Sequence, residues 1–216
     1  MLTLHTAPLL LPVGSPPVPD GAVLVERDRI AALGPRAELE SLRPDARVRA
    51  WSGVLAPGLC QWRAEFLLKG CYHPDPREAD RLGRLPLAGA ELAVLEPELD
   101  AARRSGSVRR GLQQMLRHGT TAVAVPAGDR LLAAPVSRSG LETVAPRPSA
   151  ATGSPADLDP LAGGAGLADA VVRPLAVGGR ADFAVFAVPD EDGLRAAGAA
   201  SCAATVIAGR LLYRAR

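Results

Sequence analysis

Regular hydrophobic patterning is missing from one long stretch of the chain, residues 146–174. This stretch is rich in proline, glycine, alanine and serine, so we expect it to be a linker. Before it, residues 57–145 alternate between strand and helix patterns, with room for two or three strand–helix units. A closed barrel of eight such units takes about 250 residues, and the whole chain has 216. We therefore expect an incomplete, barrel-like α/β region over residues 57–145.

Short apolar runs separated by turn residues predict a second unit at the two ends of the chain. Pro8 favours an edge position for a strand over residues 2–10, because proline lacks the N–H that a central strand donates. A short helix is expected at residues 36–42, and further strands at residues 21–26, 30–33, 48–51, 181–187, 205–207 and 210–213. These elements predict a mixed α/β protein in which residues 1–56 and 175–216 together form a small β-sandwich.

Within the α/β region, residues 88–104 have leucines at helical spacing and predict one helix, flawed by Pro97. Ser107 is a suitable N-cap for the next helix, which Gly119 would end. Strands are expected at residues 54–66 (kinked at Pro57-Gly58), 120–125 and 141–144. So few strands leave open sheet edges, which predicts a homodimer or a protein partner that covers them, unless the linker folds across.

Several segments resemble, in the right order, motifs of the amidohydrolase superfamily, in particular its imidazolonepropionase-like and nucleobase-deaminase-like metal hydrolases. The segments are DGAVLVERDRIAALGP (residues 20–35), GVLAPGLCQWRAEF (53–66), GLQQMLRHGTTAV (111–123), VGGRADFAVF (177–186) and VIAGRLLYR (206–214). The resemblance implies a composite β-domain and a metal-dependent barrel that hydrolyses carbon–nitrogen bonds other than peptide bonds.

The same comparison locates a departure from the family. The two metal-binding histidines that follow the proline–glycine pair of the family motif fall on Arg63 and Glu65 here. A guanidinium is always charged and cannot ligate a metal. The family's later ligands, which include a lysine, histidines and an aspartate, have no matching segment, and the only lysine is Lys69. We therefore expect the family's metal site to be lost, and no catalytic residue can be assigned.

A replacement site is the weaker alternative. Cys60, Glu65, Cys71 and His73 lie within fourteen residues, and zinc accepts all three residue types. Their spacing matches no familiar zinc motif, so we expect a buried Cys60 and a loop that carries Cys71 and His73, with no cofactor. Arg63 and Glu65 remain candidate ligand-binding residues, because a guanidinium suits an acidic small molecule.

Composition and charge limit the kinds of partner and the cellular location that we expect for this protein. The formal charge is +2, with arginines interleaved with acids, so we expect no nucleic-acid partner. No apolar run approaches the length of a membrane span, and the start lacks the features of a signal peptide, so a cytoplasmic protein is expected. Three cysteines do not make a disulfide framework. The heavy use of alanine and arginine with one lysine suggests a bacterial source.

Three functions fit these observations. The favoured one is a pseudo-enzyme that has lost hydrolysis and acts by binding protein. The second is a hydrolase of carbon–nitrogen bonds whose site is rearranged or completed by a partner chain. The third is a binding protein for an acidic small molecule, with Arg63 in the former substrate cavity.

Overall fold

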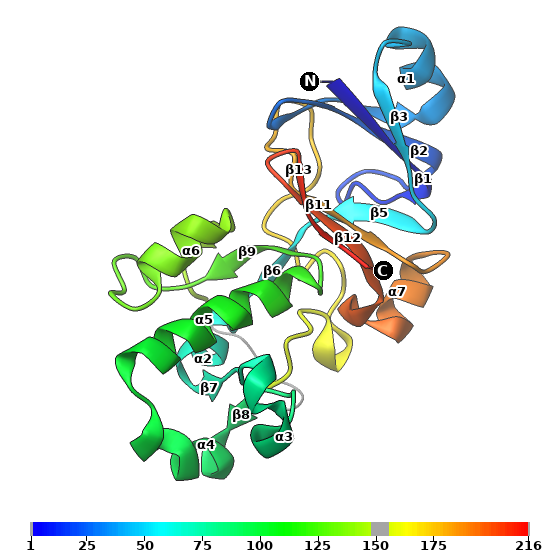
Figure 1. Cartoon of the computed structure of the whole chain (residues 1–216). Coiled ribbons are helices and arrows are strands. Elements are labelled where there is room, and N and C mark those ends of the chain that lie inside the picture. Colours follow the sequence, from blue (N-terminus) through cyan, green and yellow to red (C-terminus); the bar gives the residue numbers. More distant parts are fainter. Residues whose placement is uncertain (1, 148–155, 216) are drawn as a thin grey trace.

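The computed structural model describes residues 2–147 and 156–215 and has a mixed α/β fold, as predicted. The molecule has two parts: a large eight-stranded sheet and, next to it, a smaller α/β part that we call the α/β half (Figure 1). Strands from both ends of the chain lie side by side in the large sheet, and the central part of the sequence forms the α/β half. The finer division into domains with fixed boundaries stays a prediction.

The large sheet has the strand order β13-β12-β11-β5-β1-β2-β3, and β4 pairs separately with β1. The hairpins predicted at the two ends are confirmed: β2 pairs antiparallel with β3, and β12 with β13. The strands are β1 (Leu2–Leu10), β2 (Val18–Glu26), β3 (Arg29–Pro35), β4 (Arg47–Ala50), β5 (Val54–Pro57), β11 (Phe183–Phe186), β12 (Cys202–Ile207) and β13 (Arg210–Arg214).

Two apolar clusters hold this sheet together. Helix α1 (Arg36–Leu42) covers one face, where Leu39 packs with Leu4 and Leu24. The opposite face packs residues of β1 and β2 with residues of β11 and β12, in a cluster that includes Phe183. Strands from both ends of the chain therefore share one buried cluster, and the finer description as a β-sandwich stays a prediction.

The edge position predicted for the first strand is wrong. Strand β1 is internal: it pairs with β2 on one side and with β4 and then β5 on the other. Pro8 is exposed and lies between Thr6, the last residue paired with β4, and Leu9, the first paired with β5. Proline is tolerated there because β1 changes neighbours at that residue, so the missing N–H interrupts no ladder.

The α/β half has a three-stranded parallel sheet in the order β10-β9-β6, with β6 at Leu59–Gln61, β9 at Thr120–Ala124 and β10 at Glu142–Val144. Three helices pack on it: α2 (Ala64–Lys69), α5 (Ala101–Leu116) and α6 (Ala133–Ser139). Met115 of α5, Leu67 of α2 and Val136 of α6 meet Val123 of β9 in one buried cluster. The strands predicted over residues 120–125 and 141–144 are confirmed.

The segment predicted as a kinked strand over residues 54–66 does hold the first parallel strand, β6, but it is not one continuous strand. Gly58 divides it into β5 of the large sheet and β6 of the parallel sheet, and the chain then turns into α2. A Cβ atom on Gly58 would lie 2.1 Å from the side chain of Thr121 on β9. Only glycine allows the chain to pass so close to the neighbouring strand at this junction.

The helix predicted over residues 88–104 is also divided. Pro97 falls in a 3-10 turn, Glu96–Glu98, between α4 (Gly89–Leu95) and α5. Asp100, not Ser107, is the N-cap of α5, and its carboxylate accepts the N–H of Arg103 at 2.7 Å. Ser107 lies inside the helix, where its hydroxyl accepts the backbone N–H of His73 at 2.8 Å. A polar residue that looks like a cap thus serves a tertiary contact.

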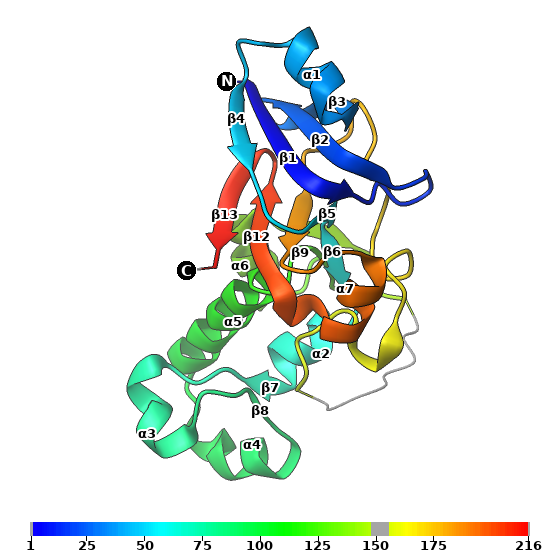
Figure 2. The same ribbon diagram turned by 90° about the vertical axis from the view of Figure 1, so that its right-hand side faces the viewer.

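The remaining elements connect these parts. They are β7 (Cys71–Tyr72), β8 (Leu87–Ala88), α3 (Ala79–Leu82), α7 (Glu191–Ala197) and the 3-10 turns Pro76–Glu78, Ala162–Gly164 and Ala199–Ser201. Strands β7 and β8 form a small hairpin beside α3 and α4 at the end of the molecule farthest from β1 to β4 (Figure 2).

The described part of the expected linker packs against both the large sheet and the α/β half. Leu161, Leu167 and Val171 belong to a buried cluster with β5 and β11. Cys60 on β6 donates its N–H to the carbonyl of Ala170 at 2.7 Å, next to an antiparallel bridge between Leu59 and Val171. The outer edge of β6 is therefore covered by the protein's own chain. No helix among the described residues combines the length and apolar character that crossing a membrane requires.

Substituting Gly58 tests the junction between the two sheets. Gly58→Ala is expected to destabilise the protein by about 1–3 kcal/mol, because the new methyl group collides with Thr121. The matched control is Gly106→Ala inside α5, where the added Cβ meets only the flexible end of Arg110. That control gains about 0.5–1 kcal/mol of helix stability. Urea unfolding measures both, and equal effects would contradict the assigned packing.

The buried histidine of β1 predicts a dependence of stability on pH. His5 is 1% exposed, and burial, with a smaller effect of Arg49, lowers its pKa from 6.5 to about 3. Below pH 6.5 the unfolded chain binds a proton at this residue that the folded protein does not. The free energy of unfolding therefore falls by about 2 kcal/mol from this group between pH 7 and pH 5.

The measurement is urea unfolding at pH 7 and pH 5 of the wild type and of His5→Asn, whose amide oxygen can still accept the Trp51 N–H. We expect the variant to lose less stability on acidification. The same loss in both proteins would contradict this role of His5, because carboxylate effects are common to the pair.

Candidate functional site

The natural place for a site in the α/β half is the carboxyl end of its parallel strands, where barrel and open α/β folds bind their ligands. Strand β6 ends at Gln61, and Trp62 and Arg63 lead directly into α2. Strands β9 and β10 end beside it, at Ala124 and Val144, since both run parallel in the same sheet.

This end of the sheet is covered by the segment that follows β10. The Gln61 side chain is 2% exposed, donates to the carbonyl of Leu158 at 2.9 Å and accepts the N–H of Arg63 at 3.0 Å. The Trp62 indole donates to the carbonyl of Asp169 at 3.0 Å. Arg147 donates to the same carbonyl at 2.6 Å and places its guanidinium 3.5 Å from the centre of the Trp62 ring. The strand ends therefore face backbone carbonyls of residues 158–169.

Arg63 and Glu65 occupy the start of α2, as the chain leaves β6. Arg63 is the residue before the first turn, and its guanidinium lies 5.8 Å from the Phe66 ring. Glu65 forms an ion pair with Lys69, one turn further along the helix, at 3.2 Å. Lys69 also reaches Asp129 at 2.9 Å, which links α2 to the loop before α6. Glu65 is thus part of a surface ion-pair network.

The candidate zinc ligands are distributed over different elements. Cys60 lies on β6, Cys71 on β7 and His73 just beyond β7, and all three are buried. Within the described residues, no three His, Cys, Asp or Glu side chains come together as a metal-binding group. Burial raises the pKa of the Cys60 thiol to about 12, and burial also raises the pKa of Cys71. Both thiols are therefore protonated in the metal-free protein.

His73 is a packed core residue with two ring contacts. Its Nδ1 atom lies 3.0 Å from the Gln114 side-chain oxygen and its Nε2 atom 2.9 Å from the Leu67 carbonyl. Burial lowers the pKa of His73, so the neutral ring is favoured. A neutral ring that donates from Nε2 to Leu67 and accepts at Nδ1 from the Gln114 amide, with its O and N exchanged, satisfies both contacts. This histidine connects β7, α2 and α5.

The donor set of the described residues does not fit the metal that the family resemblance implies. Arg63 cannot ligate, Glu65 is engaged by Lys69, and the buried thiols of Cys60 and Cys71 lie on separate strands. His118, at the end of α5, has its Nδ1 atom 3.1 Å from the Gln114 carbonyl, as a helix-end histidine would.

A polar cluster beside Tyr72 was missed in the sequence. Glu78 accepts the Tyr72 hydroxyl at 2.7 Å and pairs with Arg103 at 2.6 Å, and the guanidiniums of Arg103 and Arg110 lie 5.6 and 5.9 Å from the Tyr72 ring. Asp75 and Glu78 form a capping box around the 3-10 turn. The Asp-x-x-Glu spacing was readable as a capping box, but the distant arginines were not. The cluster fixes the β7–β8 hairpin to α5.

A cavity of about 60 Å³ lies at the opposite, amino end of the parallel strands. It is bordered by Thr121, Glu142, Arg173, Arg180 and Asp182. Glu142 and Arg173 form a two-pronged ion pair. The side chain of Asp182 accepts the Ala208 N–H at 2.7 Å, and burial raises its pKa. Its other oxygen is 3.0 Å from Arg180 but is not aligned for a hydrogen bond. This group joins the two sheets.

A family model gives the first comparison. Residues 21–42, which span most of β2, β3 and α1, match the model of the imidazolonepropionase-like composite domain of bacteria. The match is limited to this segment of the chain. No curated protein matches it at a significant level.

Solved structures give the second comparison. A. niger ochratoxinase shares 20% identity and a TM-score of 0.45, covering 67% of this chain and 31% of its own. Adenosine deaminase from Xanthomonas campestris, with bound zinc, shares 22% identity and a TM-score of 0.44, covering 66% and 33%. E. coli guanine deaminase shares 15% identity and a TM-score of 0.46, covering 67% and 36%. The chain spans about a third of the length of these structures.

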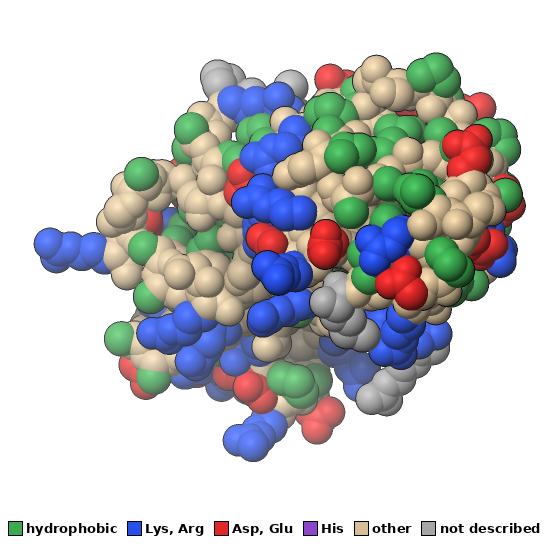
Figure 3. Space-filling model, turned by 90° about the horizontal axis from the view of Figure 1, so that it is seen from above, with side chains coloured by type: hydrophobic (Ala, Val, Ile, Leu, Met, Phe, Trp, Pro, Cys, Tyr) green, Lys and Arg blue, Asp and Glu red, His purple; other side chains and the backbone are tan. Residues whose placement is uncertain are grey.

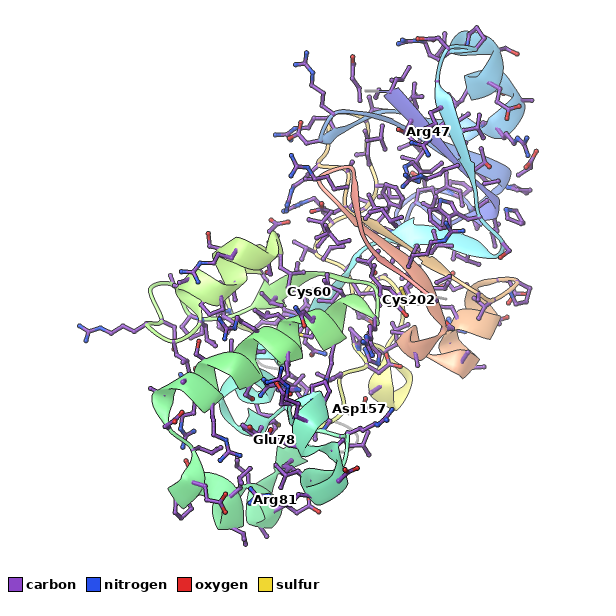
Figure 4. All side chains as sticks on the ribbon, in the orientation of Figure 1. Arg47, Cys60, Glu78, Arg81, Asp157 and Cys202 are labelled. Carbon is purple, nitrogen blue, oxygen red and sulfur yellow. The ribbon has the colours of Figure 1, made fainter. Side chains whose placement is uncertain are left out.

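Burial of the three cysteines predicts slow thiol chemistry. Cys60 and Cys202, labelled in Figure 4, lie on strands of the two different sheets, and burial raises the pKa of Cys202 to about 11. We expect all three native thiols to react with an aromatic disulfide reagent at pH 8 at least about a hundredfold more slowly than in the unfolded chain. Ser41→Cys, at an exposed position of α1, supplies a fast-reacting control. A fast native thiol in the wild type would contradict the assigned burial.

Proposed function

We propose that this protein is a pseudo-enzyme of amidohydrolase-like ancestry that has lost metal-dependent hydrolysis of carbon–nitrogen bonds and acts by binding protein. The observation that carries the proposal is which residues occupy the two positions where the resembling family has its metal-binding histidines. Arg63 and Glu65 stand there, and Glu65 is paired with Lys69 on α2. Both side chains are held by the surface of that helix.

The chemistry of hydrolysis supports the same conclusion. Metal-assisted hydrolysis requires several neutral or anionic ligands that converge on one ion and lower the pKa of a bound water. Arg63 brings a permanent positive charge to the first ligand position, which opposes a cation electrostatically. The buried thiols of Cys60 and Cys71 are protonated and lie on separate strands. No side chain of this group is suited to replace the missing histidines.

The covering of the parallel strand ends supports the loss of a substrate pocket. Gln61 and Trp62 point at the carbonyls of Leu158 and Asp169, so residues of the chain lie where a barrel would receive its substrate. The contacts at these strand ends therefore favour a structural role for them.

Binding is supported by the large sheet. Among the described residues, β4 pairs only with β1, and β13 pairs only with β12. Open strand edges are templates for pairing with another chain, and proteins that do not use them usually protect them. A protein partner is therefore the natural ligand of this sheet.

The proposal predicts an inert protein in hydrolysis assays. Purified without chelator, it should contain less than about a tenth of an equivalent of zinc and show kcat/KM below about 1 M⁻¹ s⁻¹ on guanine, adenosine and imidazolonepropionate, at least four decades under the ordinary enzyme range. The double variant Arg63→His, Glu65→His restores the two histidines and should remain inactive with added zinc, because the later ligands are also missing.

Two outcomes would overturn this proposal. Near-stoichiometric zinc that is lost in Cys71→Ser or His73→Ala would establish a replacement site. Turnover that Arg63→Ala abolishes would establish a rearranged hydrolase. A second protein that confers hydrolytic activity when it is mixed with this one would favour the partner-completed enzyme.

A further inference from the structure

The open edges of β4 and β13 lie close together. Trp51 directly follows β4, and the guanidinium of Arg214 on β13 is 5.7 Å from the centre of its ring. In Figure 2 both strands lie on the same side of the molecule, with the two chain ends nearby. These two edges, together with Trp51, form a single surface that we call the β4–β13 seam.

Three arginines concentrate positive charge on the seam. Arg47 and Arg49 on β4 are opposite Thr3 and His5 of β1, and Arg214 on β13 is opposite Ala204 of β12. Within the described residues, none of the three forms an ion pair with a carboxylate. Figure 4 labels Arg47 among the strands of the large sheet.

Figure 3 views the molecule from above and shows basic side chains in a row, with acidic side chains among them. His5, which lies beneath the seam and accepts the Trp51 indole N–H at 3.1 Å, has a lowered pKa and stays neutral at physiological pH. The charge of the seam therefore comes from its arginines and does not vary near neutral pH.

Apolar side chains accompany the charge. Val48 on β4 is 47% exposed and Leu212 on β13 is 43% exposed, and both belong to the few large hydrophobic residues that the surface exposes. Trp51 is half-buried beside them. A ligand that alternates acidic and apolar side chains would engage both kinds of group, whereas a uniformly charged polymer would leave the apolar groups in water.

Strand β13 has an open edge whose regular part is at Tyr213 and Arg214, because a register shift in the pairing with β12 leaves Leu212 unpaired. Ala215 donates its N–H to Ala203 of β12 at 2.8 Å. Hydrogen bonds alternate along an antiparallel strand, so the N–H and C=O of the preceding residue, Arg214, point away from β12. An extended segment laid along β13 would meet these backbone groups, with its carboxylates near the arginines.

We propose that the β4–β13 seam binds an extended acidic segment of a partner protein by strand addition to β13. Carboxylates of the segment pair with Arg47, Arg49 and Arg214, and its apolar side chains contact Leu212 and Trp51. Main-chain hydrogen bonds supply affinity and the arginines supply selectivity, as in other strand-addition complexes. This inference rests on the proposed binding function and specifies its surface and the chemistry of the partner.

The test uses the full chain and a fluorescent nine-residue peptide of alternating glutamate and valine with blocked ends. Anisotropy should show saturable binding that weakens as salt is added. The double variant Arg47→Glu, Arg214→Glu should raise Kd at least about tenfold. The matched control, Arg84→Glu with Arg109→Glu, changes the net charge equally at exposed positions elsewhere and should change Kd less than about twofold.

Two further probes separate strand addition from simple charge attraction. The same peptide N-methylated at alternate residues keeps its carboxylates but cannot complete the backbone ladder, and it should bind at least about tenfold more weakly. A peptide with lysine in place of glutamate should not bind. A melting temperature for each variant establishes that it is folded, and the neutral pair Arg47→Gln, Arg214→Gln provides a milder second test.

The inference is overturned if the glutamate–valine peptide does not bind the wild type, if charge reversal leaves Kd unchanged, or if the N-methylated peptide binds as well. A single-stranded oligonucleotide that binds more tightly than the peptide and displaces it would identify a polyanion site instead. Self-association lost in the double variant, without peptide binding, would identify a second copy as the occupant. Failure of peptide binding leaves the loss of hydrolysis standing, whereas turnover with intact peptide binding overturns only that loss.

Discussion

The structure depends on the passage of the chain through Gly58. In one residue the backbone leaves the large sheet and enters the parallel sheet, and it does so against the side chain of Thr121. The N–H of Gly58 bonds to the carbonyl of Asp182 at 3.2 Å, and the Asp182 side chain accepts the N–H of Ala208. Segments from the start, middle and end of the sequence thus meet at one point. The two halves hold together because this junction is hydrogen-bonded as well as packed.

Local pattern predicted the parts of the fold whose hydrogen bonds are also local. The hairpins of β2 with β3 and of β12 with β13, and the helix α1, follow from turn residues and apolar spacing that lie within a few residues of each other. The predictions failed where a distant contact decided the outcome. Ser107 resembles a cap but bonds to His73, and Pro8 resembles an edge residue but lies where β1 changes partners.

In the candidate site too, features set by nearby residues could be predicted from the sequence, and features set by distant contacts could not. The sequence could locate Arg63 and Glu65 because a motif with fixed spacing precedes them. It could not show that Lys69 would engage Glu65, or that Gln61 would reach Leu158, 97 residues away. The burial of Cys71 and His73 depends on α5, whose packing no local pattern specifies. The chemistry of a side chain is readable from its type, but its protonation state depends on what covers it.

Strand edges are covered by other residues of the chain in the α/β half, whereas two strand edges of the large sheet are open. In the α/β half, residues 158–171 cover the edge of β6 and the ends of the parallel strands, so polar groups at this edge find hydrogen-bond partners within the same chain. In the large sheet, β4 and β13 keep open edges lined by arginines. The proposed partner binding therefore belongs to the large sheet, whose edges remain open and charged. The covered strand ends of the α/β half and the open edges of the large sheet are separate surfaces of one fold, although the two halves also meet away from Gly58, where the Thr205 hydroxyl of β12 donates to the Leu116 carbonyl of α5 at 2.6 Å.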